Sequence, residues 1–340
     1  MRALSTKLRA IVLAAAVGGL LPLAAGSASL ADDASTGSAG EPPLTGTILA
    51  FRQNEDQLTG TLLTMRPDGS NRRFLAIGVT FGASFSPDGR QVAFAKDGDI
   101  FVMPATGGAA RRVVAGPHFS FGPTWSPNGR YLAYASRDEN EPASWDVFRV
   151  TVASPPGSVV RLTTDALDAA SGCGRAWGFD GQVRFGAPAW DPEGRVIAAV
   201  ASCLPDSMDG DAAVVYLAPQ GNRIVRVIGN PPKGPMYEPS SVDWSPDGGM
   251  VAMTDIAGYD HMGPGRFYVM NRDGTDRRQL VEPPDEEEYG ATSPTWWPTG
   301  SYVAYHYRAG WEGEALWITN LAGTRKWKVA EGLRPEDWKP

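Results

Sequence analysis

Short apolar runs recur along the chain, and each one follows the same kind of polar turn. The turn reads Ser-Pro-Asp-Gly-Arg or a variant of it, after a Trp or Phe. Pro presets φ at the second turn position, Asp or Asn suits the third, and Gly tolerates positive φ at the exit. The pattern therefore predicts a strand on each side of the turn. The turns are at 85–90, 125–130, 190–195, 244–249 and 296–301, and the apolar runs are at 91–94, 131–134, 196–199, 250–253 and 302–305.

An aromatic-centred run follows each apolar run, and a glycine turn then leads to a fourth segment of strand character. The glycine turn is clearest in two matching stretches, Arg-Pro-Asp-Gly-Ser-Asn-Arg-Arg-Phe-Leu at 66–75 and Asn-Arg-Asp-Gly-Thr-Asp-Arg-Arg-Gln-Leu at 271–280. A four-stranded unit repeated along a chain is typical of a β-propeller, in which each unit is one blade. The aromatic-centred runs are 99–103, 146–150, 214–217, 266–270 and 315–318.

The number of blades follows from the glycine turns, of which there are six, against five polar turns. The first unit begins at 47–51 with a second strand that has no first strand before it, whereas 334–340 resembles the first-strand segment 122–127. We therefore expect an all-β fold, a six-bladed β-propeller with four-stranded antiparallel blades, whose ring the C-terminal strand closes by completing the first blade. The glycine turns lie near Gly69, Gly107, Gly157, Gly221, Gly274 and Gly323.

These repeated pieces resemble the WD40-like repeats of TolB-like propellers, and the resemblance covers about 45–340. It implies the six-bladed fold. It leaves the function open, since such propellers occur in translocation-system proteins, scaffolds, lyases and peptidases. The turn tryptophans Trp125, Trp190, Trp244, Trp296 and Trp338 are expected to pack between blades rather than to bind a ligand.

The N-terminus has the layout of a secretory signal peptide. Arg2, Lys7 and Arg9 precede an apolar run at 10–25, and small residues lead to a cleavage site before Asp32. A retained membrane anchor is the alternative, but it needs a longer uninterrupted apolar stretch. We expect a signal peptide at 1–31, a flexible leader at 32–44 and a single propeller domain at 45–340.

Charge and composition narrow the partners. Without 1–31 the chain carries 28 basic and 38 acidic residues, a net charge of −10, and it has no basic stripe for nucleic acid. The full sequence has 25 Arg against 6 Lys and much Ala, Gly and Pro, which suggests a bacterial origin. The expected location is secreted, periplasmic or cell-envelope, with no membrane span in the mature chain.

Candidate binding residues gather in the loops that join second to third and fourth to first strands, which share one face of a propeller. The second-to-third loops hold 15 acidic and 5 basic residues. Loops that vary on one face of a repeat scaffold commonly carry binding. For the three histidines, dispersed surface positions remain the alternative, because no metal-site spacing links them. The candidates are His118, Trp145, Trp177, Tyr259, Asp260, His261, His306 and Trp311.

Cys173 and Cys203 are the two cysteines of the chain. One falls in a long insertion and the other ends a second strand, which places both on the same face. In an exported protein this favours a disulfide that holds the insertion.

The sequence thus predicts an exported, non-catalytic binding or scaffold propeller that is monomeric. Its partner is expected to be a protein, of basic character, or an envelope glycan; no cofactor and no metal is expected. The alternative is a propeller lyase or glycan-acting hydrolase with histidine and carboxylates in the central funnel, for which Asp260, His261 and His306 are the best candidates. No nucleophile elbow, Cys–His signature or phosphate loop is present.

Overall fold

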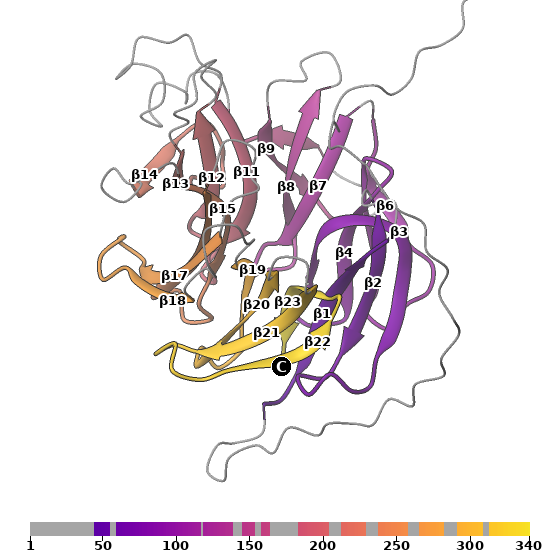
Figure 1. The fold of residues 1–340 in the computed structure, drawn as a ribbon. Coiled ribbons are helices and arrows are strands. Elements are labelled where there is room, and N and C mark those ends of the chain that lie inside the picture. Colours follow the sequence, from indigo (N-terminus) through magenta and orange to yellow (C-terminus); the bar gives the residue numbers. More distant parts are fainter. Residues whose placement is uncertain are drawn as a thin grey trace, which may run out of the picture. The chain divides into compact units, whose positions relative to one another are not determined.

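The described part of the chain folds into strands alone, which confirms the all-β class. The computed structural model describes residues 44–54, 59–116, 118–138, 145–153, 158–163, 183–203, 212–228, 237–257, 265–281, 291–308 and 313–340. All of these belong to one compact unit, Leu44–Pro340, and its sheets are antiparallel (Figure 1). Within these ranges the chain has no helix with the length and apolarity that crossing a bilayer requires.

Four sheets have four strands each, paired in the order of the chain. In each sheet, the strand that comes first in the sequence lies at one edge and ends in a turn tryptophan. Their strands are β7 (His118–Trp125), β8 (Tyr131–Asp138), β9 (Asp146–Thr151) and β10 (Val159–Arg161); β11 (Val183–Trp190), β12 (Ile197–Cys203), β13 (Ala212–Leu217) and β14 (Ile224–Ile228); β15 (Tyr237–Trp244), β16 (Met250–Ala257), β17 (Gly265–Asn271) and β18 (Arg278–Val281); and β19 (Ala291–Trp296), β20 (Tyr302–Arg308), β21 (Glu314–Asn320) and β22 (Lys326–Glu331).

A fifth sheet has seven strands and contains both ends of the propeller sequence. Its strand β3 is long, and it pairs with β2 up to Val79 and with β4 from Thr80 onward. The last strand, β23, pairs with β1, with Trp338 opposite Ile48. The predicted pairing of 334–340 with the strand at 47–51 is thereby confirmed. In order along the sheet the strands are β23 (Arg334–Lys339), β1 (Thr47–Gln53), β2 (Gly60–Met65), β3 (Arg73–Phe85), β4 (Gln91–Lys96), β5 (Asp99–Pro104) and β6 (Arg111–Val114).

The recurring polar turns fold as the sequence predicts, because their side chains satisfy their own backbone. In the turn after β3, Ser86 Oγ accepts from Gln91 N at 2.9 Å and donates to Asp88 Oδ1 at 2.6 Å. The Gly89 N–H closes the turn on the Ser86 carbonyl at 2.7 Å, with φ of +66° at Gly89. The turns after β7 and β15 repeat these bonds. The recurring polar turn is therefore a structural element, in keeping with the packing role expected for its tryptophan.

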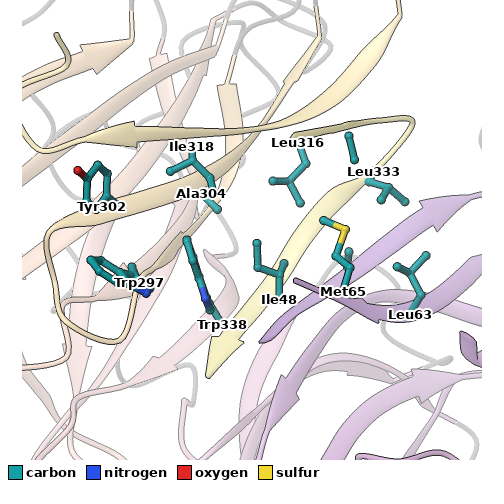
Figure 2. Close-up of a cluster of buried hydrophobic side chains, with 12 residues drawn as sticks. Ile48, Leu63, Met65, Trp297, Tyr302, Ala304, Leu316, Ile318, Leu333 and Trp338 are labelled. Atoms are coloured by element: carbon teal, nitrogen blue, oxygen red, sulfur yellow. The ribbon is translucent and has the colours of Figure 1, made fainter. Parts of the chain in front are cut away.

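The turn tryptophans pack between sheets. Trp338 is 5% exposed and lies beside Ile48, with its ring centroid 6.2 Å from that of Trp297 (Figure 2). The indole N–H groups of Trp297 and Trp338 both donate to the Thr45 carbonyl at 3.1 Å. This cluster joins residues from the first and last sheets of the chain into one apolar core. Trp125, Trp244 and Trp296 are buried in the same way, and Trp190 is half-buried within its cluster.

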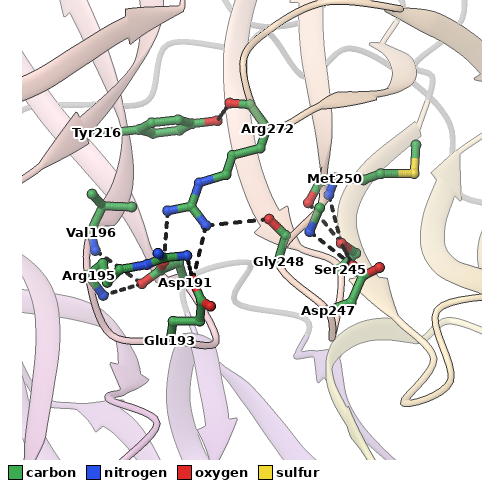
Figure 3. Close-up of polar contacts among 11 residues, drawn as sticks. Asp191, Glu193, Arg195, Val196, Tyr216, Ser245, Asp247, Gly248, Met250 and Arg272 are labelled. Atoms are coloured by element: carbon green, nitrogen blue, oxygen red, sulfur yellow. Dashed lines mark hydrogen bonds and ion pairs between the residues drawn. The ribbon is translucent and has the colours of Figure 1, made fainter.

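A buried ion pair joins the sheets that begin with β11 and β15. Asp191 Oδ2 accepts from the Arg272 guanidinium at 2.9 Å, and the Asp191 side chain is fully buried. The guanidinium also lies over the Trp244 ring, 4.9 Å from its centroid. Figure 3 shows Arg272 reaching from its turn toward Asp191 and Glu193 on the neighbouring sheet.

Six strands contact one another in succession, and we call them the innermost strands: β3, β7, β11, β15, β19 and β23. Taken in turn, β3 contacts β7, β7 contacts β11, β11 contacts β15, β15 contacts β19, β19 contacts β23, and β23 contacts β3. Separate antiparallel sheets whose innermost strands meet in this way define an all-β propeller fold.

Candidate functional site

A β-bulge interrupts each of the innermost strands near its middle. The pairing register shifts between Thr80 and Ala83 in β3, between Phe121 and Thr124 in β7, and between Thr292 and Thr295 in β19. Bulges leave residues outside the ladder and bend the strand. The bulged residues include Gly82 and Gly122, and Ala187 and Ser293 at the corresponding places, all with positive φ.

These bulges face a cavity of about 680 Å³. It is lined by β3, β7, β11, β15, β19 and β23 together with Trp145 and Val200, so residues far apart in the sequence, from Gly82 to Asp337, reach it. Ligand sites in proteins are typically concave and few, so this cavity is the default candidate site.

Two carboxylates of the last strand, β23, line the cavity. Glu336 Oε2 accepts from Gly82 N at 2.8 Å and from Ala83 N at 3.0 Å, while Asp337 Oδ2 accepts from Phe85 N at 2.7 Å. The side chains thus replace ladder partners between β23 and β3. Burial raises the pKa of Glu336 to about 7 and the pKa of Asp337 to about 6, although the N–H bonds act in the opposite direction.

A third carboxylate, Asp243 on β15, plays the same part toward β19. Its Oδ2 accepts from Trp296 N at 3.2 Å and its Oδ1 from Trp244 N at 2.9 Å. Burial, and next the nearby charge of Asp337, raises the pKa of Asp243 to about 7. The cavity is therefore an acidic environment in which protons are held up to neutral pH.

An aromatic group formed by Phe119, Phe121 and Trp145 lies where β7 enters the cavity. The Trp145 ring meets Phe121 edge-on at 5.0 Å and Phe119 at 6.1 Å between centroids. The Arg137 guanidinium lies over Trp145 at 5.0 Å and over Phe119 at 5.7 Å. Phe119 is 38% exposed, and both Phe121 and Trp145 line the cavity. Aromatic rings with a cation over them offer apolar and polar contacts together.

A second polar group connects the cavity wall with β20 and β21. Thr292, which lines the cavity, has its Oγ1 3.1 Å from His306 Nδ1, and His306 Nε2 is 3.1 Å from Glu314 Oε2. Burial lowers the pKa of His306, and the hydrogen bond from His306 lowers the pKa of Glu314. At neutral pH the pair is therefore neutral imidazole and carboxylate.

The predicted site residues have different outcomes. His118 is exposed at the start of β7, next to the aromatic group that contains Trp145, and His306 is buried beside the cavity wall. The structure thus places these three predicted residues in two separate groups. Cys203 ends β12, and the disulfide stays a prediction. Trp177, Tyr259, Asp260, His261, Trp311 and Cys173 lie outside the described residues.

Sequence reasoning missed most of the cavity lining. Glu336, Asp337 and Asp243 lie within two residues of turn tryptophans, in strands predicted to be structural. Thr292 borders a bulge that no sequence pattern predicts. A signal was available for the carboxylates, because charged residues inside a buried strand are unusual and need partners. Among the described residues, no group of three His, Cys, Asp or Glu side chains is placed to hold a metal ion.

The sheets and the cavity along their innermost strands define a β-propeller, and solved structures of that class are similar to this chain. No protein-family model matches the sequence, and no curated protein matches it. TolB from Acinetobacter baumannii superposes with a TM-score of 0.62 at 15% identity, covering 87% of this chain and 67% of that one.

A TolB-type protein from Agrobacterium tumefaciens gives a TM-score of 0.54 at 13% identity and covers 87% of this chain and 99% of that one. The hydrazine synthase of Kuenenia stuttgartiensis gives 0.64 at 11% identity, where this chain spans 47% of the other. At these identities the likeness establishes the fold. The structural neighbours are thus TolB-like β-propeller proteins.

Proposed function

We propose that this protein is an exported binding propeller that holds a protein or cell-envelope partner at the aromatic end of its cavity. The observation that carries the proposal is the group of Phe119, Phe121 and Trp145 under Arg137. Its rings are partly open to solvent and lead into the cavity. Interface hot spots are enriched in Trp and Arg and cluster at pockets, which is the combination found here.

The proposed frame is a ring of six blades. The long strand β3 would serve two blades, its first half beside β2 and its second half beside β4. The β23–β1 pairing would complete the first blade, and the contacts of each innermost strand with the next support a closed ring. Such a frame holds loops from different blades rigidly around one opening, which suits recognition.

The partner is expected to carry positive charge. The chain has a formal net charge of −7, and the carboxylates of Glu336, Asp337 and Asp243 line the cavity. Complementary charge speeds encounter and excludes acidic partners. The proposal also includes export, with cleavage of the signal peptide before Asp32. N-terminal sequencing of the protein recovered from its bacterial host checks this cleavage. We also propose a disulfide between Cys173 and Cys203. The mass of the non-reduced protein checks it, because the disulfide removes two hydrogen atoms.

The experiment is affinity capture from envelope extract, using the mature chain and variants of the aromatic group. We expect Phe119→Ala and Trp145→Ala each to weaken binding of the captured partner about thirtyfold, since losing a hot-spot ring costs about 2 kcal/mol. Raising the salt concentration should weaken capture further, because the charge contribution is screened.

The chain offers a matched control. Phe74 on β3 is 60% exposed and has Arg52 over its ring at 5.6 Å, but it does not line the cavity. Phe74→Ala should leave capture unchanged. Equal capture by the wild type and both aromatic-group variants would remove this end of the cavity from consideration.

A further inference from the structure

Three side chains from three neighbouring strands form a chain of hydrogen bonds that starts at the cavity. Thr292 of β19 pairs directly with His306 of β20 in the strand register, and Glu314 of β21 pairs with Arg308, two residues further along β20. Side chains two residues apart on a strand share a face, so the three groups lie in a row across the sheet. The two links are both 3.1 Å long.

The protonation states give this row a direction. Because the Glu314 carboxylate is ionised and accepts from Nε2, the Nε2–H tautomer of His306 is favoured, and Nδ1 keeps a lone pair. Nδ1 then accepts from the Thr292 hydroxyl. Hydroxyl, imidazole and carboxylate in this sequence are the arrangement that activates a nucleophilic oxygen.

The surroundings of Thr292 supply the other requirements of such a site. Thr292 lines the cavity, whereas His306 is 5% exposed, so an entering molecule would meet the hydroxyl and not the base. Arg334 also lines the cavity, and its charge acts on both His306 and Glu314. Within the described residues the buried Arg334 Nε has no hydrogen-bond partner, and the guanidinium lies over the Phe51 ring, 5.9 Å from its centroid.

The neighbouring backbone is unusual as well. Ser293, next to Thr292, has a φ of +52° in the bulge of β19. Non-glycine residues at positive φ carry strain, and such strain clusters at functional sites. In β3 and β7 the corresponding bulges use glycine, at Gly82 and Gly122, so this strand has kept a side chain where two others have none.

We propose that Thr292, His306 and Glu314 form an acyl-transfer site that hydrolyses small esters within the cavity. Thr292 Oγ1 attacks the ester carbonyl carbon while its proton passes to His306 Nδ1, and Arg334 stabilises the oxyanion. The C–O bond to the alcohol then breaks, and the alcohol leaves with the proton from Nδ1. Water attacks the acyl-threonine through the same base, which releases the carboxylic acid and restores the hydroxyl. Glu314 is a positioning residue that fixes the tautomer.

The acidic lining limits the substrate class. Glu336, Asp337 and Asp243 line the same cavity, and their ionised forms at and above neutral pH disfavour an anionic substrate. A neutral ester, or one whose alcohol carries an ammonium group, fits the charges of the cavity. The volume of about 680 Å³ admits a small ester rather than a polymer.

The test uses the whole mature protein and a fluorophosphonate probe, which loses fluoride when a nucleophilic hydroxyl attacks phosphorus. We expect a covalent adduct on the peptide that contains Thr292, detected by mass spectrometry. Thr292→Val should abolish the adduct and Thr292→Ser should keep it. Thr319→Val is the matched control, because Thr319 is a buried threonine of the same sheet that does not line the cavity.

Two further variants separate catalysis from structure. His306→Gln should slow labelling at least a hundredfold, and thermal unfolding of each variant shows whether it folds. Glu314→Gln should slow labelling and also move the acid limb of its pH profile to lower pH, since Glu314 raises the pKa of His306. A purely structural role would leave that profile in place. Absence of an adduct on Thr292 in the folded wild-type protein would overturn the proposal, whether or not partner capture succeeds.

Discussion

Asp191 occupies the turn position at which Ser86, Ser126 and Ser245 stand in three other sheets. Its Oδ1 replaces the serine hydroxyl as the acceptor for the turn backbone, with hydrogen bonds from Arg195 N at 2.6 Å and Val196 N at 3.0 Å. Its second oxygen is then available to Arg272 on the next sheet. One substitution in a repeated turn thus converts a local cap into a link between sheets, at the cost of burying a charge that needs its partner.

We predict that Arg272→Met lowers the free energy of unfolding by about 3 kcal/mol, because the Asp191 carboxylate stays buried without its cation. Adding Asp191→Ser in the Arg272→Met background should recover more than half of that loss, since serine serves the same position in the other turns. Denaturant unfolding of the single and double variants measures both steps. A double variant no more stable than Arg272→Met would contradict this account of the pair.

The bulges of the innermost strands set how closely neighbouring sheets approach. A Cβ placed on Gly82 of β3 would lie 2.4 Å from the Gly122 Cα of β7, whereas a Cβ on Gly122 would meet no atom within 4 Å. Both glycines have positive φ, of +89° and +59°. The two positions therefore share a backbone requirement but differ in the space around them.

We predict that Gly122→Ala costs about 1 kcal/mol of folding free energy, the ordinary penalty of an L residue in the left-handed region. Gly82→Ala should cost about 3 kcal/mol, because it adds a clash with backbone that cannot move aside. Thermal or urea unfolding of the two variants gives the comparison. Equal destabilisation would mean that β3 and β7 are not in the close contact described.

Acidic groups from β15 and β23 gather around the cavity. Glu336 and Asp337 hold β23 to β3, and Asp243 holds β15 to β19, each by accepting backbone N–H groups. Their raised pKa values mean that the folded protein binds more protons than the unfolded chain between about pH 4 and pH 7. Stability from these groups is therefore present at low pH and is lost as the pH rises through their folded pKa values.

We predict a lower melting temperature at pH 8 than at pH 5.5. The lowered pKa of His306 has the opposite effect on stability below about pH 6.5, because the unfolded imidazole then binds a proton more readily than the folded one. This single group is outweighed by the three carboxylates. Exposed carboxylates with lowered pKa values, such as Asp88 and Asp273, act below about pH 4.

Glu336→Gln isolates the effect of one cavity carboxylate. Its amide oxygen can keep both N–H bonds that Oε2 accepts, while the group no longer titrates. The fall in melting temperature between pH 5.5 and 8 should become smaller in Glu336→Gln. An unchanged or steeper fall would show that the Glu336 carboxylate is ionised throughout this range.

Much of the fold could be predicted because its signals are local. A Ser-Pro-Asp-Gly turn satisfies its own hydrogen bonds, so it forms the same structure wherever it occurs, as at Ser86 and Ser126. The candidate site was predicted less well, although Trp145, His118 and His306 were named. Its other members, such as Thr292 and Glu336, acquire their role from strands that are distant in sequence, and no spacing along the chain encodes that.

The amino-acid sequence sufficed for the all-β class, the strand order and the pairing of the last strand with the first, since repeated turns and apolar runs report on each strand separately. The assembled structure was needed to show that Glu336, Asp243, Thr292 and Trp145 share one cavity, and which of them titrate near neutral pH. The reason is physical. Burial, charge proximity and the free volume between innermost strands arise from how sheets pack against one another, and each depends on residues hundreds of positions apart.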